Sequence, residues 1–360
     1  MSTVSAVISR QAVKHNFARI QSLAPNSKII AILKANAYGH GLLEMAKTLP
    51  DCDAIGVARL EEALALRAGG IVKPILLLEG FFNPSDIPIL VTNNLQTVVH
   101  SLEQVEQLEQ ASHLQGQLTV WLKIDTGMNR LGINVQQFEL VTSRLQQIDL
   151  VAKPLNYMTH FACADELNNP FTSEQAQQFY QLVDGLGGEL TLANSAGILA
   201  WPETQADWIR PGLLLYGCSP IIDRIGSDDG FIAAMTLSSS VIAVKKLSAG
   251  DKVGYGSSWI AAQDTTLAVI AIGYGDGYPR HAKDGTPVLI NSKRYPIVGR
   301  VSMDMITVDL GPDNVSVQCG DKAIMWGQDL PVEEIAKHAD TICYELILQL
   351  TSRVKIKFID

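Results

Sequence analysis

Eight short apolar runs mark the first 220 residues, and each is followed by a glycine-containing or polar loop. The runs are apolar throughout rather than alternating, which is typical of parallel strands covered by helices. Between several of them, apolar residues three and four apart predict helices, as at Leu102, Val105 and Leu108. Eight such units predict a (β/α)8 TIM-type barrel, whose reactive groups gather at the carboxyl ends of the strands. The predicted strands lie at residues 28–33, 54–58, 74–78, 96–100, 118–124, 155–161, 190–193 and 213–217.

The pattern changes near residue 230, where short runs separated by Gly, Pro and Asp turns replace these units. Residues 226–231 have the composition of a linker. We therefore predict a barrel domain over residues 1–228 and a mainly β domain over residues 229–360. A helical period covers 332–339, and the run 342–350 fits a helix or a strand. The predicted strands of the second domain lie at residues 235–247, 266–274, 287–291, 295–302, 305–310 and 322–326.

Length and composition support this division. A chain of 360 residues exceeds the roughly 250–300 residues at which one hydrophobic core stops growing, so two domains are expected. Hydrophobic residues make up 47% of the chain and charged residues only 18%, which excludes a disordered protein. The formal charge of −9 argues against nucleic acid or an anionic membrane as a partner. Any anion that the protein binds must therefore be held by a local site.

The sequence also predicts the cellular location of the protein. Its apolar runs are far shorter than the roughly 20 residues that span a bilayer, and residues 1–11 lack the apolar core of a signal peptide. The five cysteines are an odd number without CxxC spacing, which fits reduced thiols better than disulfides or a zinc site. The sequence contains neither a GxxxxGK phosphate loop nor clustered metal-ligand spacing. We expect a soluble, cytoplasmic protein without a bound metal.

A lysine, Lys34, follows the first predicted barrel strand, where an apolar wall meets the mouth of the barrel. Burial disfavours an ammonium and lowers the pKa of a lysine from its ordinary value near 10.4. A neutral lysine amine can form a Schiff base with a carbonyl compound. From its placement alone, Lys34 is better explained as a lysine that extends to solvent or one in an ion pair, so the Schiff-base hypothesis needs further residues.

Further polar residues lie at the ends of the later strands, with Arg210 just before the last one, on the face where a barrel carries its chemistry. Each of them also has a purely structural explanation: a histidine can lie in a core, and an Asn-Ser pair can cap a helix. Their occurrence at several strand ends together favours a catalytic site. These residues are Lys123, Asp125, Thr126, Arg130, His160, Asn194, Ser195 and Arg210.

An ordered set of motifs over nearly the whole chain resembles the alanine racemase family, which depends on pyridoxal 5'-phosphate (PLP). The motifs are AILKANAYGHG (31–41), LKIDTGMNRLG (122–132), MTHFACAD (158–165), NSAGIL (194–199), WIRPGLLLYG (208–217), VGYGSSW (253–259), AIGYGDGYPR (271–280), GRVSMDM (299–305) and CYELI (343–347). The resemblance implies an eight-stranded α/β barrel followed by a mainly β domain. It also implies a racemase that interconverts L-alanine and D-alanine by two-base proton transfer at the α-carbon.

The resemblance implies specific roles at the reacting centre. Lys34 is similar to the lysine that binds PLP as a Schiff base and acts as a base on one face of the α-carbon. Tyr255 is similar to the base on the opposite face, which the second subunit of a head-to-tail homodimer supplies. The unperturbed pKa values of lysine and tyrosine lie near 10, so both groups must be activated by their surroundings.

Three further cations also match family positions. Arg210 resembles the arginine that faces the pyridine nitrogen of the cofactor, where related barrel decarboxylases carry a carboxylate; a cation there disfavours protonation of this nitrogen. Arg130 resembles the group that contacts the phenolate oxygen of PLP and the carboxylate of the substrate. Lys123 matches a position that is often carbamylated, a change that replaces its positive charge beside Arg130 by a negative one.

The remaining matches concern the phosphate, the cofactor ring and the substrate entrance. The resemblance implies that the phosphate is bound by side chains and by backbone around late strands, at Tyr38, Ser195, Gly212, Leu213 and Tyr344. His160 resembles the histidine beside the cofactor ring. Met303 resembles a substrate-contacting residue that reaches across the dimer, together with Tyr274 and Asp304 at the entrance. The last two also fit a buried phenol and a turn carboxylate.

The chain departs from the family pattern at three positions. Thr191 stands where some members have a histidine that links the arginine to the catalytic tyrosine, which leaves open how Tyr255 is activated. Asn129 precedes Arg130 where glycine is common, and Ser302 precedes Met303 where some relatives have cysteine. None of these departures predicts a different substrate.

Other functions remain open at this point. A racemase for serine or another small amino acid would share these motifs, because they define the reaction better than the side-chain pocket. A non-catalytic PLP carrier on a related barrel would not require the second domain or Tyr255. A Schiff-base aldolase would require Lys34 alone, and its spectrum would lack the visible band of bound PLP.

Overall fold

The computed structural model describes residues 4–313 and 316–360. The chain forms two compact units. The barrel unit comprises residues 17–215 and 220–223, and the β unit comprises residues 4–16, 216–219 and the described residues from 224 onward. Helix α1 (Arg10–Leu23) contains the boundary between residues 16 and 17. Among the described residues, no helix is long and apolar enough to cross a bilayer.

The barrel unit is built on eight parallel strands that form a closed sheet. Their order is β5-β4-β3-β2-β10-β9-β8-β6, and pairing of β5 with β6 closes the circle, with Val98 opposite Trp121. This arrangement confirms the predicted (β/α)8 barrel. The strands are β2 (Lys28–Ile32), β3 (Ala54–Val57), β4 (Ile75–Leu77), β5 (Gln96–Val99), β6 (Val120–Asp125), β8 (Asn156–Met158), β9 (Leu190–Asn194) and β10 (Trp208–Arg210); the short β7 (Ile133–Asn134) is added beside β6.

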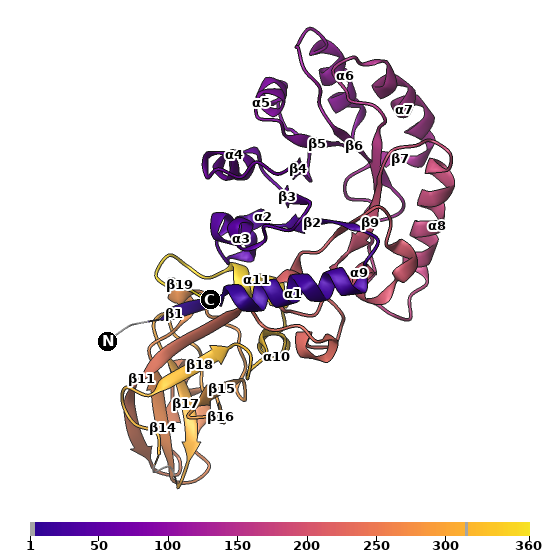
Figure 1. The fold of residues 1–360 in the computed structure, drawn as a ribbon. Helices are drawn as coiled ribbons and strands as arrows, with labels where there is room; N and C mark the ends of the chain where they lie inside the picture. The colour runs from indigo at the N-terminus through magenta and orange to yellow at the C-terminus, as the bar shows by residue number, and fades with distance from the viewer. Residues whose placement is uncertain (1–3, 314–315) are drawn as a thin grey trace. The chain divides into compact units, whose positions relative to one another are not determined.

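Helices α4 to α8 lie outside these strands (Figure 1). In α6 the buried residues include Val105 and Leu108, three apart on one face, and the Ser101 side chain caps the helix by accepting a hydrogen bond from the Gln104 backbone. The helical period read from the sequence therefore corresponds to the face that packs on the sheet. After the short helical segment α2 (Lys34–Tyr38), the helices are α3 (Leu42–Thr48), α4 (Leu60–Ala68), α5 (Asp86–Thr92), α6 (Leu102–Gln110), α7 (Phe138–Gln147), α8 (Phe171–Val183) and α9 (Ser195–Ala200).

The eighth strand lies earlier than the sequence predicted. Residues 213–217 were assigned to it, but β10 is Trp208–Arg210 and Leu213–Tyr216 is a 3₁₀ helix. All four residues of this 3₁₀ helix are almost completely buried. An apolar run that is buried on every side has no period that separates a strand from a helix. As a consequence, Arg210 is the last residue of the eighth strand rather than a residue that precedes it.

The β unit contains a sheet in the order β16-β15-β18-β11-β1-β19, with β14 paired to both β11 and β17. The 13-residue β11 pairs with β1 and β18 through its first half and with β14 through its second half. Its strands are β1 (Ser5–Ser9), β11 (Met235–Leu247), β14 (Thr265–Ile270), β15 (Pro287–Ile290), β16 (Lys293–Pro296), β17 (Ile306–Gly311), β18 (Lys322–Trp326) and β19 (Lys355–Ile359), and β12 (Lys252–Val253) pairs with β13 (Trp259–Ile260).

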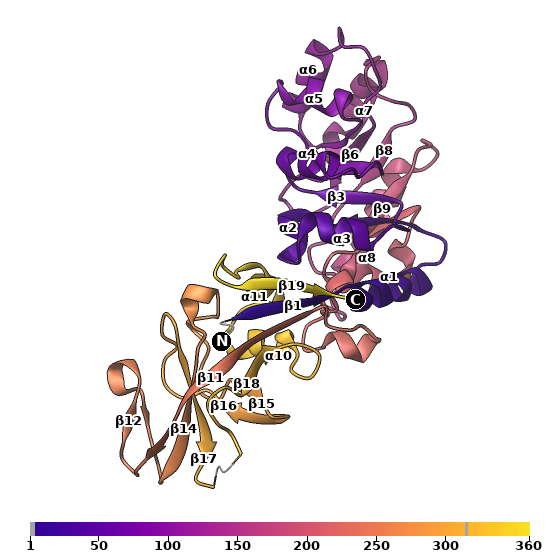
Figure 2. The same ribbon diagram turned by 60° about the vertical axis from the view of Figure 1, so that its left-hand side comes forward.

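Two features of the β unit add to the sequence prediction. Strand β1 was not predicted; it pairs antiparallel with β11 and parallel with β19, and Figure 2 shows it between them. The ambiguous run at 342–350 contains a helix, α11 (Cys343–Leu348), which follows the predicted helix α10 (Val332–His338). The mainly β character of this unit is thus confirmed.

Candidate active site

The carboxyl ends of the barrel strands bring four cationic side chains into electrostatic contact. Lys34 follows β2, Lys123 lies within β6, Arg130 lies in the loop after β6, and Arg210 ends β10. The pKa of Lys123 is lowered to about 8, first by burial and then by the positive charges of Arg210, Arg130 and Lys34. The barrel unit of an acidic protein therefore contains a strongly cationic site, which suits an anionic ligand.

Lys34 has the surroundings that favour a neutral amine. Burial lowers its pKa, and the charge of Arg130 lowers it further, while the carboxylates of Glu79 and Glu62 oppose these effects. A larger fraction of neutral amine at physiological pH makes the side chain a better nucleophile and base. This environment agrees with the prediction that burial lowers the pKa of Lys34.

The backbone after Lys34 adopts a rare conformation. The four residues Ala35 to Tyr38 all have φ of 53°, in the left-handed region. Hydrogen bonds hold this turn, because the Ala37 amide donates to the Leu33 carbonyl (2.8 Å) and the Leu42 amide donates to Asn36 Oδ1 (2.9 Å). Non-glycine residues keep such strain only where the surrounding structure fixes them, and such sites are often functional.

The turn places the Tyr38 hydroxyl beside the segment that follows β10. A Cβ at Gly212 would lie 2.5 Å from this hydroxyl oxygen, so only glycine leaves the space open. Burial raises the pKa of Tyr38 to about 12, which keeps the phenol protonated and able to donate a hydrogen bond. Ser195 Oγ accepts from the Gly212 amide (2.9 Å). A hydroxyl pair beside a glycine amide is a suitable cradle for a phosphate.

Arg210 is fixed by three hydrogen bonds in the interior of the barrel unit. Nη1 donates to Thr191 Oγ1 (2.7 Å), and Nη2 donates to the Thr159 and Leu192 carbonyls (2.7 and 2.9 Å). Burial lowers its pKa to about 9, which still leaves the guanidinium charged at neutral pH. Thr191 Oγ1 in turn donates to the Trp208 carbonyl (2.9 Å). At the position where some relatives carry histidine, this chain thus has a buried acceptor for the arginine.

His160 lies two residues beyond β8. Burial lowers its pKa well below the ordinary value, and the charges of Arg210, Lys123 and Arg130 act in the same direction. The imidazole is therefore neutral at physiological pH and suits packing against an aromatic ring rather than binding an anion. Gln175 Nε2 donates to the His160 carbonyl (3.1 Å), which ties this segment to helix α8.

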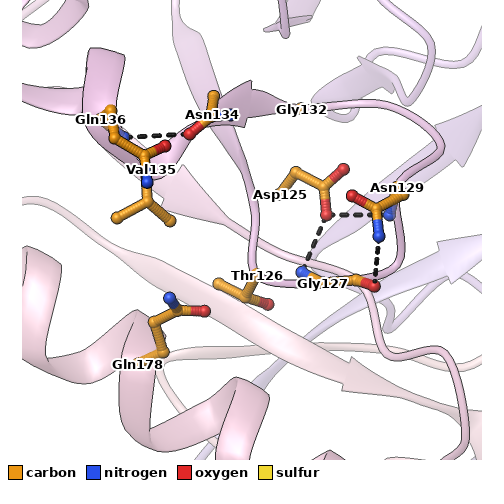
Figure 3. A pocket seen from close by; sticks show the side chains of 9 residues that line it. All are labelled: Asp125, Thr126, Gly127, Asn129, Gly132, Asn134, Val135, Gln136 and Gln178. Atoms are coloured by element: carbon orange, nitrogen blue, oxygen red, sulfur yellow. Dashed lines mark hydrogen bonds between the residues drawn. The ribbon is translucent and has the colours of Figure 1, made fainter.

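The loop that carries Arg130 is shaped by a carboxylate. Asp125 Oδ1 accepts from the Gly127 and Asn129 amides (2.9 and 3.0 Å), and Asn129 Nδ2 donates to the Gly127 carbonyl (Figure 3). The φ of Asn129 is 55°, a conformation that glycine and asparagine adopt most easily. This explains why Asn129 can stand where glycine is common. Next to the loop lies a polar cavity of about 350 Å³, lined also by Gln178 of α8.

Glu79 was missed by the sequence analysis. It directly follows the third predicted strand, and its charge raises the pKa values of Lys34 and Lys123. Its carboxylate also forms an ion pair with Arg59 Nη1 (3.1 Å). Its place at a strand end was the available signal, but it belongs to none of the motifs.

In the β unit, the predicted base and the predicted substrate and entrance residues are exposed. Tyr255 is 70% exposed, Met303 52% and Tyr274 38%. The Tyr274 amide donates to the Ser302 carbonyl (3.1 Å), and a Cβ at Gly256 would lie 3.2 Å from Arg300 Nη1. The loop 299–305 therefore contacts both the segment that carries Tyr255 and the segment that carries Tyr274.

Two predicted phosphate ligands have different settings. Leu213 is fully buried in the 3₁₀ helix after β10, close in sequence to Gly212. Tyr344 belongs to α11 of the β unit and is half-buried. The role of each residue at the phosphate stays a prediction.

Comparison with known proteins agrees with this geometry. The sequence models "Alanine racemase, N-terminal domain" and "Alanine racemase, C-terminal domain" match residues 8–220 and 234–358. An alanine racemase from Shewanella loihica is 58% identical over 351 residues, which are 98% of each chain. The crystal structure of a biosynthetic alanine racemase from Pseudomonas aeruginosa superimposes with a TM-score of 0.96 at 40% identity over all of both chains. An alanine racemase from Bartonella henselae, solved with covalently bound pyridoxal phosphate, gives a TM-score of 0.91 at 27% identity, again over both whole chains.

Proposed function

The chain belongs to the alanine racemase family and interconverts L-alanine and D-alanine, and we propose that it uses PLP with Lys34 and Tyr255 as its two bases. The observation that carries the proposal is the environment of Lys34. This lysine follows the first barrel strand, has a lowered pKa, and lies within the electrostatic reach of Arg130 and Lys123. Such a buried amine beside cations suits covalent attachment of an anionic aldehyde.

The donors of the barrel unit are suited to the parts of PLP. The space beside Gly212, with the Tyr38 hydroxyl and Ser195 Oγ around it, suits the phosphate. In the proposed site Tyr344 adds a further hydroxyl to the phosphate, and Leu213 a backbone amide. The neutral His160 would pack on the ring, Arg210 would face the pyridine nitrogen, and Arg130 would bind the phenolate oxygen.

The proton chemistry is assigned to two side chains. When bound, PLP supplies the electron sink that no side chain offers, since it accepts the electron pair of the α-carbon. Lys34 Nζ takes or returns the α-proton on one face, and the Tyr255 phenol does so on the other. Arg130 orients the substrate carboxylate, and the buried Arg210 keeps a positive charge opposite the ring nitrogen, which limits side reactions such as transamination.

We propose a homodimer with shared sites, because Tyr255, Met303 and Tyr274 are exposed in the β unit although their proposed roles require contact with substrate. In this dimer Met303 contacts the substrate, and Tyr274 and Asp304 narrow its entrance. We also propose a cytoplasmic location, since the five cysteines are free thiols, which persist in reducing compartments.

The test combines a spectrum, a covalent label and an assay. The purified protein should show a visible band of bound PLP and should racemise L-alanine. Borohydride reduction followed by peptide mapping should find the pyridoxyl group on Lys34, with the buried Lys123 as the internal comparison. A label on Lys123 or elsewhere would reject the assignment of Lys34 even if the protein is active.

A further inference from the structure

Arg353 of the β unit has no part in the proposed proton transfers, but it contacts two carboxylates. Its Nε lies 3.2 Å from Asp276 Oδ1, and its Nη2 donates to Asp304 Oδ1 at 2.8 Å. The two carboxylates belong to different loops. Asp276 ends the 3₁₀ turn that begins at Tyr274, and Asp304 follows Met303 directly. One guanidinium thus joins the segments that carry both proposed entrance residues.

The Asp276 side of this junction is buried. The Asp276 side chain is only 5% exposed, and its second oxygen accepts from the Gly273 amide at 3.0 Å. The Asp304 side chain is 53% exposed, so this contact lies at the surface. A planar guanidinium can donate hydrogen bonds to two carboxylates from different edges and so fix their relative positions. A lysine ammonium is a point charge on a flexible stem and does not fix them in this way. The buried Asp276 therefore acts as the anchor, and Asp304 is the part that is held.

Further contacts bring together the segments that carry Gly275, Met303 and Arg353. The Gly275 amide donates to the Met303 carbonyl (2.8 Å), and Thr351 Oγ1 donates to the Gly275 carbonyl (2.9 Å). A Cβ at Gly275 would collide with Arg353 Nη1 and would lie 3.0 Å from the Met303 carbonyl oxygen. The guanidinium therefore lies directly against the Gly275 backbone, and any side chain there would displace it.

We propose that Arg353 is a positioning residue that fixes Tyr274 and Met303 for substrate by clamping the loops 273–278 and 302–305 together. The inference rests on the proposed function, because the entrance role of Tyr274 and the substrate contact of Met303 belong to that proposal. In the proposed site, Arg353 itself contacts neither substrate nor cofactor. Its effect should appear in substrate affinity and in the selection of small side chains, and not in the proton transfers.

The kinetic test uses the holoenzyme with L-alanine and L-serine as substrates. Arg353→Ala should raise KM for L-alanine about tenfold, leave kcat within about twofold, and reduce the preference for alanine over serine, because both loops lose their fixed place. Arg353→Lys should fall between this variant and the wild type. Gly275→Ala keeps every charge but displaces the guanidinium, so it should change KM in the same direction.

The control variant is Lys283→Ala. It removes another exposed ion pair of the same unit, Lys283 with Asp340 (2.9 Å), and should leave both constants within about twofold of the wild type. A fall in kcat and PLP content for Arg353→Ala, with KM and the alanine-to-serine ratio unchanged, indicates a merely structural role and overturns the proposal.

Amide hydrogen exchange provides a readout that does not depend on activity. In Arg353→Ala, and in Gly275→Ala if the first variant folds poorly, exchange should accelerate in 273–278 and 302–305 while β11 and β18 keep their protection. Unchanged or uniformly faster exchange contradicts the clamp. If the wild type racemises no alanine, the proposed function fails, whereas this exchange pattern still decides the inference about Arg353.

Discussion

The two units present their candidate residues in opposite ways. In the barrel unit Arg210 and Lys123 are buried, and their pKa values are lowered to about 9 and about 8. In the β unit Tyr255 is 70% exposed and Met303 52% exposed. Burial tunes the groups of the first unit within the unit itself. The groups of the second must obtain their reactivity or their specificity from what they contact when the site is complete.

The strongest test of the barrel side of this comparison is Lys34→Ala. Loss of the amine removes both the covalent attachment of PLP and one base, so racemisation should fall by more than about 10⁴-fold. Turnover in both directions and the visible spectrum after gel filtration measure these effects. An internal comparison is Lys28→Ala, which changes an exposed lysine at the start of β2, the strand that precedes Lys34, and should retain PLP and activity. Normal retention of PLP by Lys34→Ala would mean that another group holds the cofactor.

The next test removes the phenol of the β unit. Tyr255→Phe should lower turnover by about 100-fold or more, because one face of the α-carbon loses its base. Isotope washout should be impaired more from one enantiomer than from the other, and PLP should stay bound to Lys34. Since Tyr255 is largely exposed, the melting temperature should change little. Equal loss of washout from both enantiomers would contradict the two-base assignment.

A mixing experiment connects the two units. If each site uses Lys34 of one subunit and Tyr255 of the other, the two inactive variants should regain activity when their subunits reassort. Mixing either variant with itself is the matched control. No recovery after verified reassortment would place both bases in one chain.

The barrel side was the more readable from the sequence, and the reason is physical. Strands such as β2 are uninterrupted apolar runs, and the residue after such a strand lies at the mouth of a barrel whatever else the chain does. Lys34 and Ser195 could therefore be located without knowledge of any contact. The eighth strand was misplaced because Trp208–Arg210 is short and ends in a charge, whereas Leu213–Tyr216, two residues later, are apolar and buried.

The β side was harder to read because its contacts are distant in sequence. Strand β1 alternates buried and half-buried residues over only five positions, and its partners lie beyond residue 230. Nothing near Arg353 in the sequence indicates that it joins Asp276 and Asp304. In the barrel unit, the resemblance drew attention to Thr191, but its hydrogen bond with Arg210 depends on how the neighbouring strands β9 and β10 pair.

A smaller effect should follow from the pKa of Lys123. This pKa is about 8 in the folded protein and near 10.4 in the unfolded chain, so between these values the unfolded state binds more protons. The free energy of unfolding should therefore rise with pH, by up to about 2 kcal/mol from pH 7 to about 9.5. Urea unfolding of the wild type and of Lys123→Met in CO₂-free buffer measures the difference between the two slopes.

The pH dependence of the free energy of unfolding distinguishes a free amine at Lys123 from a carbamylated side chain. A free amine destabilises the fold while it is charged, and this penalty disappears as the pH rises from about 8 toward the unfolded pKa. A carbamylated side chain is already anionic beside Arg130 and Arg210, so bicarbonate should flatten the wild-type slope and leave Lys123→Met unchanged. Parallel slopes for both proteins in CO₂-free buffer would contradict the lowered pKa.

The smallest expected effect is on kcat, when one side-chain hydroxyl is removed from each unit. Thr191 Oγ1 accepts from the buried Arg210, whereas Ser302 Oγ donates to the Met305 carbonyl (2.6 Å) in an exposed turn. Thr191→Val keeps the volume and leaves an arginine N–H without its acceptor, so kcat should fall about fivefold, and Thr191→Ser should restore it. Ser302→Ala should leave kcat within about twofold, since water can replace its contacts. Equal effects of the two substitutions would mean that burial around Arg210 does not govern the chemistry, and the contrast between the units would then lie only in exposure.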